Sequence, residues 1–163
     1  MRSGRIGYGT PAGRWVVAAT VLGSGIAFLD GTVVTVALPA IDRELDAGIS
    51  GLQWTVDAYL LTLSAFLLLG GSLGDLFGRR RMFVYGLGGF AVTSLLCAVA
   101  PNIGMLVAAR ALQGLAAALL VPGSLAIIST TFTPDDAGKA IGAWSGLSGV
   151  TTAIGPFLGG YLV

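Results

Sequence analysis

The sequence contains no histidine and a single cysteine, Cys97. One cysteine cannot form an intramolecular disulfide or supply a metal site built on several thiolates. Without histidine, the chain lacks the usual zinc ligand and the side chain that most often carries protons near neutral pH. We therefore expect no metal site, a packing role for Cys97, and any handling of protons to fall to carboxylates.

Charged residues are also scarce. They make up 10% of the 163 residues, while hydrophobic residues make up 55%, and a soluble domain carries about 25% charged residues. This composition predicts an integral membrane protein with the lipid bilayer as its partner. The formal net charge of +1 leaves no broad basic surface for a nucleic acid. An enzyme is not expected, because the sequence shows no nucleophile with a base partner and no phosphate-binding loop.

Long apolar stretches follow one another along the chain, each long enough to cross a bilayer as a helix. Residues 1–14 are polar and rich in glycine, which predicts a short, flexible cytoplasmic tail. A signal peptide is not expected, because the first apolar stretch is about 25 residues long and contains an aspartate. The predicted fold is an all-α polytopic bundle of about five transmembrane helices, at residues 15–41, 51–74, 82–100, 103–130 and 140–163.

Lysine and arginine are unevenly distributed between these stretches. The tail and the link at residues 75–81 carry three each and the link before residue 140 carries Lys139, while the other two links carry only Arg43. Basic residues favour the cytoplasmic side, so the N-terminus is predicted to be cytoplasmic. The last apolar stretch reaches the final residue without a polar flank, and we expect the chain to be part of a longer protein.

Three ionisable residues, Asp30, Asp57 and Arg110, fall inside predicted spans. A charge in hydrocarbon is costly unless it is paired or faces water, which makes a functional role the first interpretation. Counted from the span ends, all three lie between the middle and the outer half of the bilayer. We expect them to share one cavity with an excess of negative charge, suited to a cation or a proton. The alternative is a structural ion pair between helices.

Two further patterns lie inside predicted spans. Gln113 follows Arg110 by one helical turn, and we expect it to hydrogen-bond either a substrate or another helix. Near the end of the chain, proline and glycine occur as GP-x-x-GG. This pattern predicts a kinked helix with a flat face that makes a tight contact and seals one side of a pathway. Its residues are Gly155, Pro156, Gly159 and Gly160.

The stretch GSLGDLFGRRR, residues 71–81, is the only strongly charged segment between apolar runs. Its glycines permit a tight turn and close packing, Asp75 can cap or bind a helix N-terminus, and the arginines anchor the cytoplasmic side. A simple basic loop would explain the arginines but not the spacing of the glycines and the aspartate. The residues predicted to form a cytoplasmic gate loop are Gly71, Gly74, Asp75, Gly78, Arg79 and Arg80.

These motifs resemble those of the major facilitator superfamily. Residues 71–80 resemble the hallmark loop between its second and third spans, and residues 110–114 (RALQG) resemble its fourth-span motif for proton coupling. The stretch LDGTVVTVALP (29–39), LQWTVDAYLL (52–61) and the pattern at 155–160 are similar to motifs of its fourteen-span drug:proton antiporter branch. The resemblance implies that the chain forms most of the N-terminal half of such a fold.

The resemblance also implies a function: proton-coupled efflux of drugs or other small, cationic or lipophilic molecules through the cell membrane, powered by the proton gradient without a cofactor. Asp30 and Asp57 become candidates for interaction with protons or cationic drugs, and Arg110 for tuning their protonation. Asp75 and Arg79 would join a cytoplasmic charge network that stabilises the outward-facing state, although Leu76 replaces a second arginine there.

The resemblance further implies partners, namely a small-molecule substrate and the missing C-terminal half of the transporter. Two alternatives stay open at this point. One is a truncated or split membrane fragment that has no transport activity alone. The other is a metabolite transporter of the same superfamily.

Overall fold

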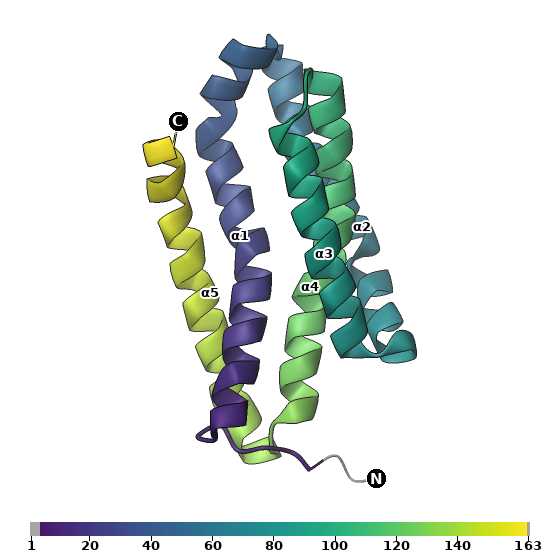
Figure 1. The fold of residues 1–163 in the computed structure, drawn as a ribbon, viewed down its shortest axis with the longest axis vertical. Coiled ribbons are helices and arrows are strands. Elements are labelled where there is room, and N and C mark those ends of the chain that lie inside the picture. Colours follow the sequence, from purple (N-terminus) through teal and green to yellow (C-terminus); the bar gives the residue numbers. More distant parts are fainter. Residues whose placement is uncertain (1–3, 163) are drawn as a thin grey trace.

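The computed structural model describes residues 4–162, which form five long helices running up and down (Figure 1). Among the described residues, four helices are long and apolar enough to cross a membrane, and the fifth is 29 residues long but carries more small and polar side chains. The predicted all-α fold is confirmed. The helices are α1 (Pro11–Leu45), α2 (Gly48–Phe77), α3 (Arg79–Ala98), α4 (Ile103–Thr131) and α5 (Pro134–Leu162).

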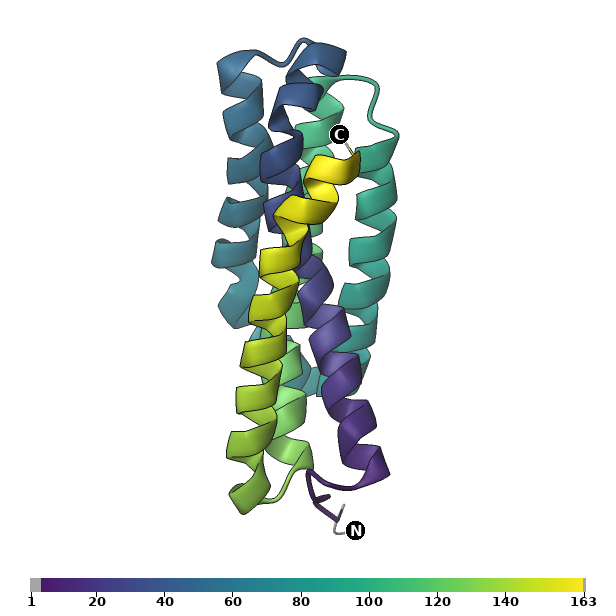
Figure 2. The same cartoon turned by 90° about the vertical axis from the view of Figure 1, so that its left-hand side faces the viewer.

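The helices form two groups that meet at α1 and α4. Helix α1 packs mainly on α5, whereas α4 packs mainly on α2 and α3. The links α1–α2 and α3–α4 lie at one end of the bundle, and the start of α1 and the α4–α5 link lie at the other (Figures 1 and 2). The arrangement leaves polar residues of α1 facing those of α4 across the junction between the groups.

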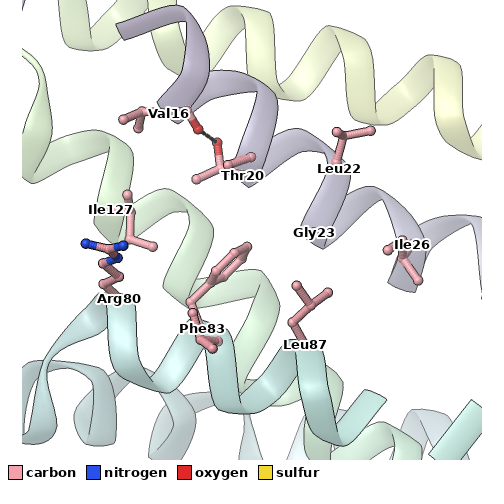
Figure 3. A pocket seen from close by; sticks show the side chains of 11 residues that line it. Val16, Thr20, Leu22, Gly23, Ile26, Arg80, Phe83, Leu87 and Ile127 are labelled. Carbon is pink, nitrogen blue, oxygen red and sulfur yellow. Dashed lines mark hydrogen bonds between the residues drawn. The ribbon is translucent and has the colours of Figure 1, made fainter. Parts of the chain in front are cut away.

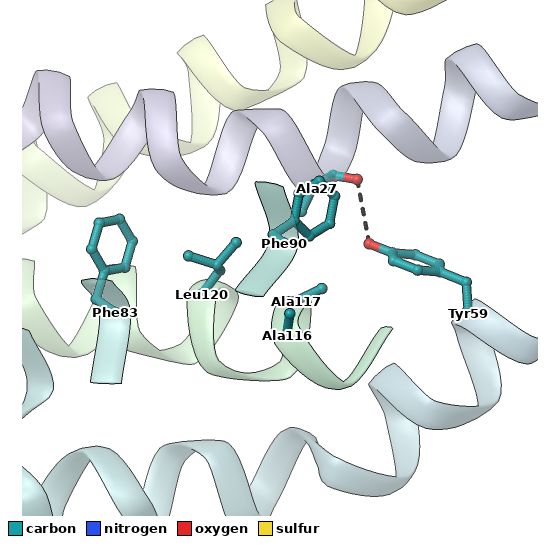
Figure 4. Packing of buried hydrophobic residues seen from close by; sticks show 7 residues of the cluster. All are labelled: Ala27, Tyr59, Phe83, Phe90, Ala116, Ala117 and Leu120. Atoms are coloured by element: carbon teal, nitrogen blue, oxygen red, sulfur yellow. Dashed lines mark hydrogen bonds between the residues drawn. The ribbon is translucent and has the colours of Figure 1, made fainter. Parts of the chain in front are cut away.

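A hydrophobic core fills the inner part of this junction (Figure 4). The aromatic rings of Phe83 and Phe90 from α3 pack beside Leu120 of α4, and all three side chains are buried. Tyr59 of α2 reaches across to α1, where its hydroxyl donates a long hydrogen bond of 3.4 Å to the carbonyl of Ala27. The core therefore contains side chains from four helices and fixes α2 and α3 relative to α1 and α4.

Helices α2 and α4 approach each other closely because small residues line their contact. Pro122 has no N–H, so it cannot donate to the carbonyl of Ala118 one turn earlier in α4. Gly70 of α2 lies against this same carbonyl, and a Cβ atom at Gly70 would collide with it. Gly114 is equally close to the backbone of Tyr59. Any larger residue at either glycine would separate the two helices.

The turn predicted over residues 71–81 is much shorter than expected. Helix α2 continues to Phe77, and only Gly78 separates it from α3. Gly78 has a φ of 98°, a conformation that glycine adopts without the steric cost of a Cβ. In the described structure no side chain caps the N-terminus of α3. Asp75 therefore does not cap α3, and pairs instead with the side chain of Arg79.

Part of the predicted flexible tail, residues 1–14, is helical. Helix α1 already begins at Pro11, a residue whose missing N–H is tolerated in the first helical turn. Thr10 is the N-cap, and its side chain accepts a hydrogen bond of 3.1 Å from the N–H of Gly13. Residues 1–3 lie outside the described part of the chain.

The segment before α1 is bound to the α4–α5 link. The N–H of Ile6 donates to the carbonyl of Thr131 (2.9 Å), and the N–H of Thr133 donates to the carbonyl of Ile6 (3.3 Å). Two residues later, the N–H of Tyr8 donates to Oδ2 of Asp136 (3.0 Å). The tail thus forms a short parallel bridge with the link, a contact between distant parts of the sequence that its polar composition does not reveal.

Candidate functional site

Arg110 is the most deeply buried charged residue that the structure describes. It lies on α4 at the junction of the two helix groups, and only 2% of its surface is exposed. A buried guanidinium is tolerated only when opposite charge and hydrogen-bond acceptors surround it. The residues around Arg110 therefore define the site.

Four residues from three helices surround the guanidinium group. Nη1 donates to Oδ2 of Asp30 on α1 (2.5 Å) and to Oε1 of Gln113 (2.6 Å). Nε donates to the backbone carbonyl of Thr55 on α2 (3.2 Å). The ring of Tyr59 lies 4.3 Å from the guanidinium carbon, within range of a cation–π interaction. The structure therefore shows the interhelical ion pair between Arg110 and Asp30 that the sequence left as one of two interpretations.

Gln113 completes the network. Its Nε2 donates to Oδ1 of Asp30 (3.0 Å) and to Oγ of Ser94 on α3 (2.8 Å). Its Oε1 also lies 3.6 Å from Sγ of Cys97, so that the thiol can donate to it. Both ends of the amide are thus bonded to neighbouring residues, and both oxygens of Asp30 are occupied. The sequence predicted that Gln113 hydrogen-bonds either a substrate or another helix. The structure shows bonds to other helices, namely α1 and α3.

Asp57 does not join this network, contrary to the prediction that it shares the cavity. Thr55 and Tyr59 are four residues apart and face Arg110, so Asp57, two residues from each, points away from it. Within residues 4–162, Asp57 makes no ion pair and does not line the cavity. Depth along a helix was estimated from the sequence, but the direction of the side chain around the helix axis decides which residues meet.

A cavity of about 380 Å³ extends from the network towards the end of the bundle that carries the α1–α2 and α3–α4 links. Polar residues at its inner end include Asp30, Ser94 and Gln113, and Glu44 lines it near the end of α1. The sequence reasoning missed Glu44. Helical periodicity could have identified it, because Glu44 follows Asp30 by four turns and lies on the same face of α1. Tyr59 was also missed, and no charge or motif singles it out.

The residues predicted to form a cytoplasmic gate gather at the α2–α3 turn. Arg79 pairs with Asp75 (Nη2 to Oδ1, 2.8 Å), and its Nη1 donates to the carbonyl of Ala126 on α4 (2.9 Å). Gly74 lies beside the Cα of Arg79, and Gly71 lies beside Pro122 of α4. A single arginine therefore connects the ends of α2, α3 and α4.

Arg80 does not take part in this pair within the described residues. It lies instead at one end of an apolar groove of about 470 Å³ between α1 and α3 (Figure 3). Phe83 and Leu87 from α3 face Gly23 and Ile26 from α1 across this groove.

The GP-x-x-GG pattern on α5 makes the predicted tight contact, and its partner is α1. A Cβ atom on Gly155 would collide with the side chain of Thr32, and one on Gly159 would come within 3.2 Å of Val36. Pro156 is exposed on another face of α5, and no atom lies within 4 Å of the position that a Cβ of Gly160 would take in the described structure. Two of the four residues therefore carry the contact.

The same helix pair is held further along by a buried hydrogen bond of 2.8 Å from Nε1 of Trp144 to Oγ of Ser24. The helix that carries Asp30 is thus bound on one side to α5 and on the other, through Arg110, to α4.

Long apolar helices around a largely buried network of charged and polar side chains define a multi-pass membrane protein with a polar site between its helices. The family model of the Major Facilitator Superfamily matches residues 20–163. The chain therefore belongs to this superfamily of membrane transporters, as the sequence motifs predicted.

Similar curated proteins are resistance and export proteins. The chain is 45% identical over 149 residues to a puromycin resistance protein of Streptomyces alboniger, an alignment that covers 91% of this chain and 30% of the relative. It is 43% identical to the tetracenomycin C resistance and export protein of Streptomyces glaucescens (89% and 27% covered). It is 42% identical to the multidrug resistance protein Stp of Mycobacterium tuberculosis (89% and 27% covered). The chain spans less than a third of the length of these relatives.

Proposed function

We propose that this chain acts as the N-terminal part of a proton-coupled exporter of drugs or other small, cationic or lipophilic molecules. The observation that carries the proposal is the buried pair of Asp30 and Arg110, which offers a protonatable carboxylate inside a membrane protein without histidine. The names of the drug-resistance relatives support export as its direction. The proposed location is the cell membrane, with the N-terminus in the cytoplasm.

In this proposal Asp30 takes up a proton and becomes neutral. The ion pair with Arg110 is then lost, but Arg110 keeps the carbonyl of Thr55 and the ring of Tyr59, which both belong to α2. Protonation therefore weakens the attachment of α1 to α4 and leaves α2 attached to α4. The proton gradient would supply the energy, and no cofactor is required.

The pair of Asp75 and Arg79 would stabilise one of the two access states. It fastens the α2–α3 turn to α4 at the proposed cytoplasmic end. Leu76, where the family motif has a second arginine, is 77% exposed and adds no charge to this contact.

The substrate would bind where this bundle meets a second half of the transporter, as in other secondary transporters built from repeats. Asp57, which faces away from the internal network, stays a candidate for contact with a cationic substrate or a proton there. The partners of this chain are then the bilayer, the small-molecule substrate and the remainder of the transporter.

The test is Asp30→Asn in the complete transporter, with efflux measured in vesicles under an imposed proton gradient. Loss of the titratable group should lower proton-driven efflux at least about tenfold, as is typical when an essential proton-transfer group is removed. Asp46→Asn makes the same chemical change on the exposed α1–α2 link and should leave efflux unchanged. Undiminished efflux in Asp30→Asn would contradict the coupling role, and uptake of a metabolite without drug resistance would indicate a metabolite transporter.

A further inference from the structure

We propose that the cavity between α1, α3 and α4 is an aqueous path that leads protons to Asp30 from the end of the bundle that carries the α1–α2 and α3–α4 links, with Glu44 as the cation-collecting residue at its entrance. The proposal rests on the proposed function, because it takes Asp30 as the coupling residue and places this end outside the cell. It adds a route and a residue that the family resemblance does not name.

The lining residues reach from the network to the end of the bundle. On α1 they follow one helix face from Asp30 through Val33, Val34 and Ile41 to Glu44 and Leu45, where the helix ends. Fourteen residues at 1.5 Å each separate Asp30 from Glu44 by about 21 Å along the axis. The opposite wall includes Ala100, which lies in the α3–α4 link. The cavity therefore connects the buried pair to the surface.

Water can occupy this space. A buried water needs room and two to four polar partners, and each water takes about 30 Å³ of liquid volume, so a cavity of about 380 Å³ holds several. Asp30, Ser94 and Gln113 supply polar atoms at the inner end. The exposure of the ion pair is unequal, because 18% of the Asp30 side chain is accessible but only 2% of Arg110. Water thus reaches the pair from the side of the carboxylate that would be protonated.

The charges around the cavity favour cations. Its charged lining consists of two carboxylates, Asp30 and Glu44, and one guanidinium, Arg110, which leaves one negative charge in excess. The other titratable group in the lining is the thiol of Cys97 on α3. Because Arg110 is already paired with Asp30, the unbalanced charge is that of Glu44 at the entrance. A negative entrance raises the local concentration of cations, protons included.

The proton transfer itself is simple. A hydrated proton from the outer solution moves along the water in the cavity and adds to an oxygen of the Asp30 carboxylate. The carboxylate becomes a carboxylic acid, its ion pair with Arg110 is lost, and no other bond is made or broken. The route lies within this bundle, so that protons need not share the space used by the transported molecule.

Cys97 offers a direct test, because it lines the cavity and is the single cysteine of the sequence. The thiolate is the nucleophile that attacks a methanethiosulfonate, forming a mixed disulfide and releasing methanesulfinate, and it forms readily only where water reaches the sulfur. In intact cells that express the transporter, we expect an externally added, membrane-impermeant methanethiosulfonate to label Cys97. The same labelling in Cys97→Ser measures any reaction elsewhere. A reagent with a trimethylammonium group should react faster than one with a sulfonate group.

The role of Glu44 is tested by the ratio of these two rates. Glu44→Gln should lower the ratio of cationic to anionic labelling by about two- to tenfold, the range expected from one charge at about 10 Å in a surface environment. Asp46→Asn changes the same charge two residues away, outside the cavity, and should leave the ratio unchanged. With the unmodified Glu44, the ratio should also fall as salt is added.

Failure of this path can be separated from failure of proton coupling, because labelling does not require transport. If Cys97 reacts only from the cytoplasmic side, or not at all, the path is wrong even when Asp30→Asn abolishes proton-driven efflux. An equal ratio in Glu44→Gln and Asp46→Asn, together with a ratio that salt does not change, would exclude Glu44 as the collecting residue.

Discussion

The protein contains two aspartate–arginine pairs with nearly the same chemistry in different surroundings. Asp30 and Arg110 lie 2.5 Å apart inside the bundle, with 18% and 2% of their side chains exposed. Asp75 and Arg79 lie 2.8 Å apart at the α2–α3 turn, with 63% and 32% exposed. The comparison shows that exposure to solvent, more than the distance between the charges, determines how much an ion pair contributes to stability.

Water determines the energetic difference. An exposed pair is screened and contributes about 0–1 kcal/mol, because either partner alone is well hydrated. Breaking a buried pair leaves one charge without compensation, which costs about 3–5 kcal/mol. The buried pair is also part of a network, since Gln113 bonds to both of its members.

The two pairs also differ in what they connect. Asp75 and Arg79 are four residues apart in sequence and join the ends of two successive helices. Asp30 and Arg110 are 80 residues apart and join the two helix groups. A change in the buried pair should therefore alter how the groups pack, whereas a change in the exposed pair should alter one turn.

The largest effect is expected from Arg110→Met. It leaves the partly buried carboxylate of Asp30, 18% exposed, without its counter-charge. The free energy of unfolding in detergent micelles should fall by about 2–3 kcal/mol, less than the loss of about 3–5 kcal/mol for a fully buried pair. Denaturant unfolding followed by tryptophan fluorescence measures this value.

The control for Arg110→Met is the double variant Arg110→Met with Asp30→Leu. Replacing both members of a buried pair with apolar residues of similar size is often neutral, so most of the lost stability should return. A double variant as unstable as the single one would mean that packing around Arg110, and not charge, holds the helix groups together.

A smaller effect is expected from Gln113→Ala. The change removes one acceptor from Nη1 of the buried Arg110, and a buried polar group that loses its partner costs about 1–3 kcal/mol. Oδ1 of Asp30 and Oγ of Ser94 also lose the amide, but both residues line the cavity, where water can replace it. Gln113→Leu removes the same hydrogen bonds but keeps most of the volume. The same unfolding measurement should give a similar loss for both variants. Full recovery in Gln113→Leu would show that Gln113 acts through its volume.

The sequence predicted the elements that depend on local patterns. Apolar length predicted the helices, and the charges inside the spans left an ion pair between Arg110 and an aspartate as one of two interpretations. The GP-x-x-GG pattern predicted a tight helix contact, which α5 makes with α1 through Gly155 and Gly159. In each case the physical signal lies within one or two helical turns of the residues concerned.

Features that depend on direction around a helix axis or on distant partners were not predicted. Asp57 was predicted to lie at the depth of Arg110, but its side chain is on the face of α2 that points away from Arg110. Glu44 lies beyond the predicted first span, so only the continuation of α1 to Leu45 places it on the same helix face as Asp30 and in the lining of the cavity. Ile6 pairs with residues more than 120 positions away, a backbone contact that carries no side-chain signature in the sequence.

At the exposed pair, Arg79→Ala should cost about 1–2 kcal/mol of unfolding free energy. It removes the ion pair and also the hydrogen bond to the carbonyl of Ala126, and a hydrogen bond from a charged donor is worth about 1.5 kcal/mol or more. Asp75→Asn removes only the charge of the partner and should cost about 0.5 kcal/mol, a difference that disappears in high salt. Equal losses in both variants would mean that the bond to Ala126 contributes nothing.

The smallest effect concerns a third aspartate, Asp136, in the first turn of α5 at the proposed cytoplasmic end. Hydrogen bonds from Lys139 and from the N–H of Tyr8 hold the pKa of Asp136 below its ordinary value. A lowered pKa in the folded state means that this contact is complete above the unfolded pKa and is lost as the pH falls through the folded one. In an acid titration, the amide chemical shift of Tyr8 measured by NMR should therefore change with a midpoint below that of a free aspartate. Lys139→Ala should raise this midpoint, because Lys139 is the larger cause of the shift, and an unchanged midpoint would show that the bond from Tyr8 alone holds the carboxylate.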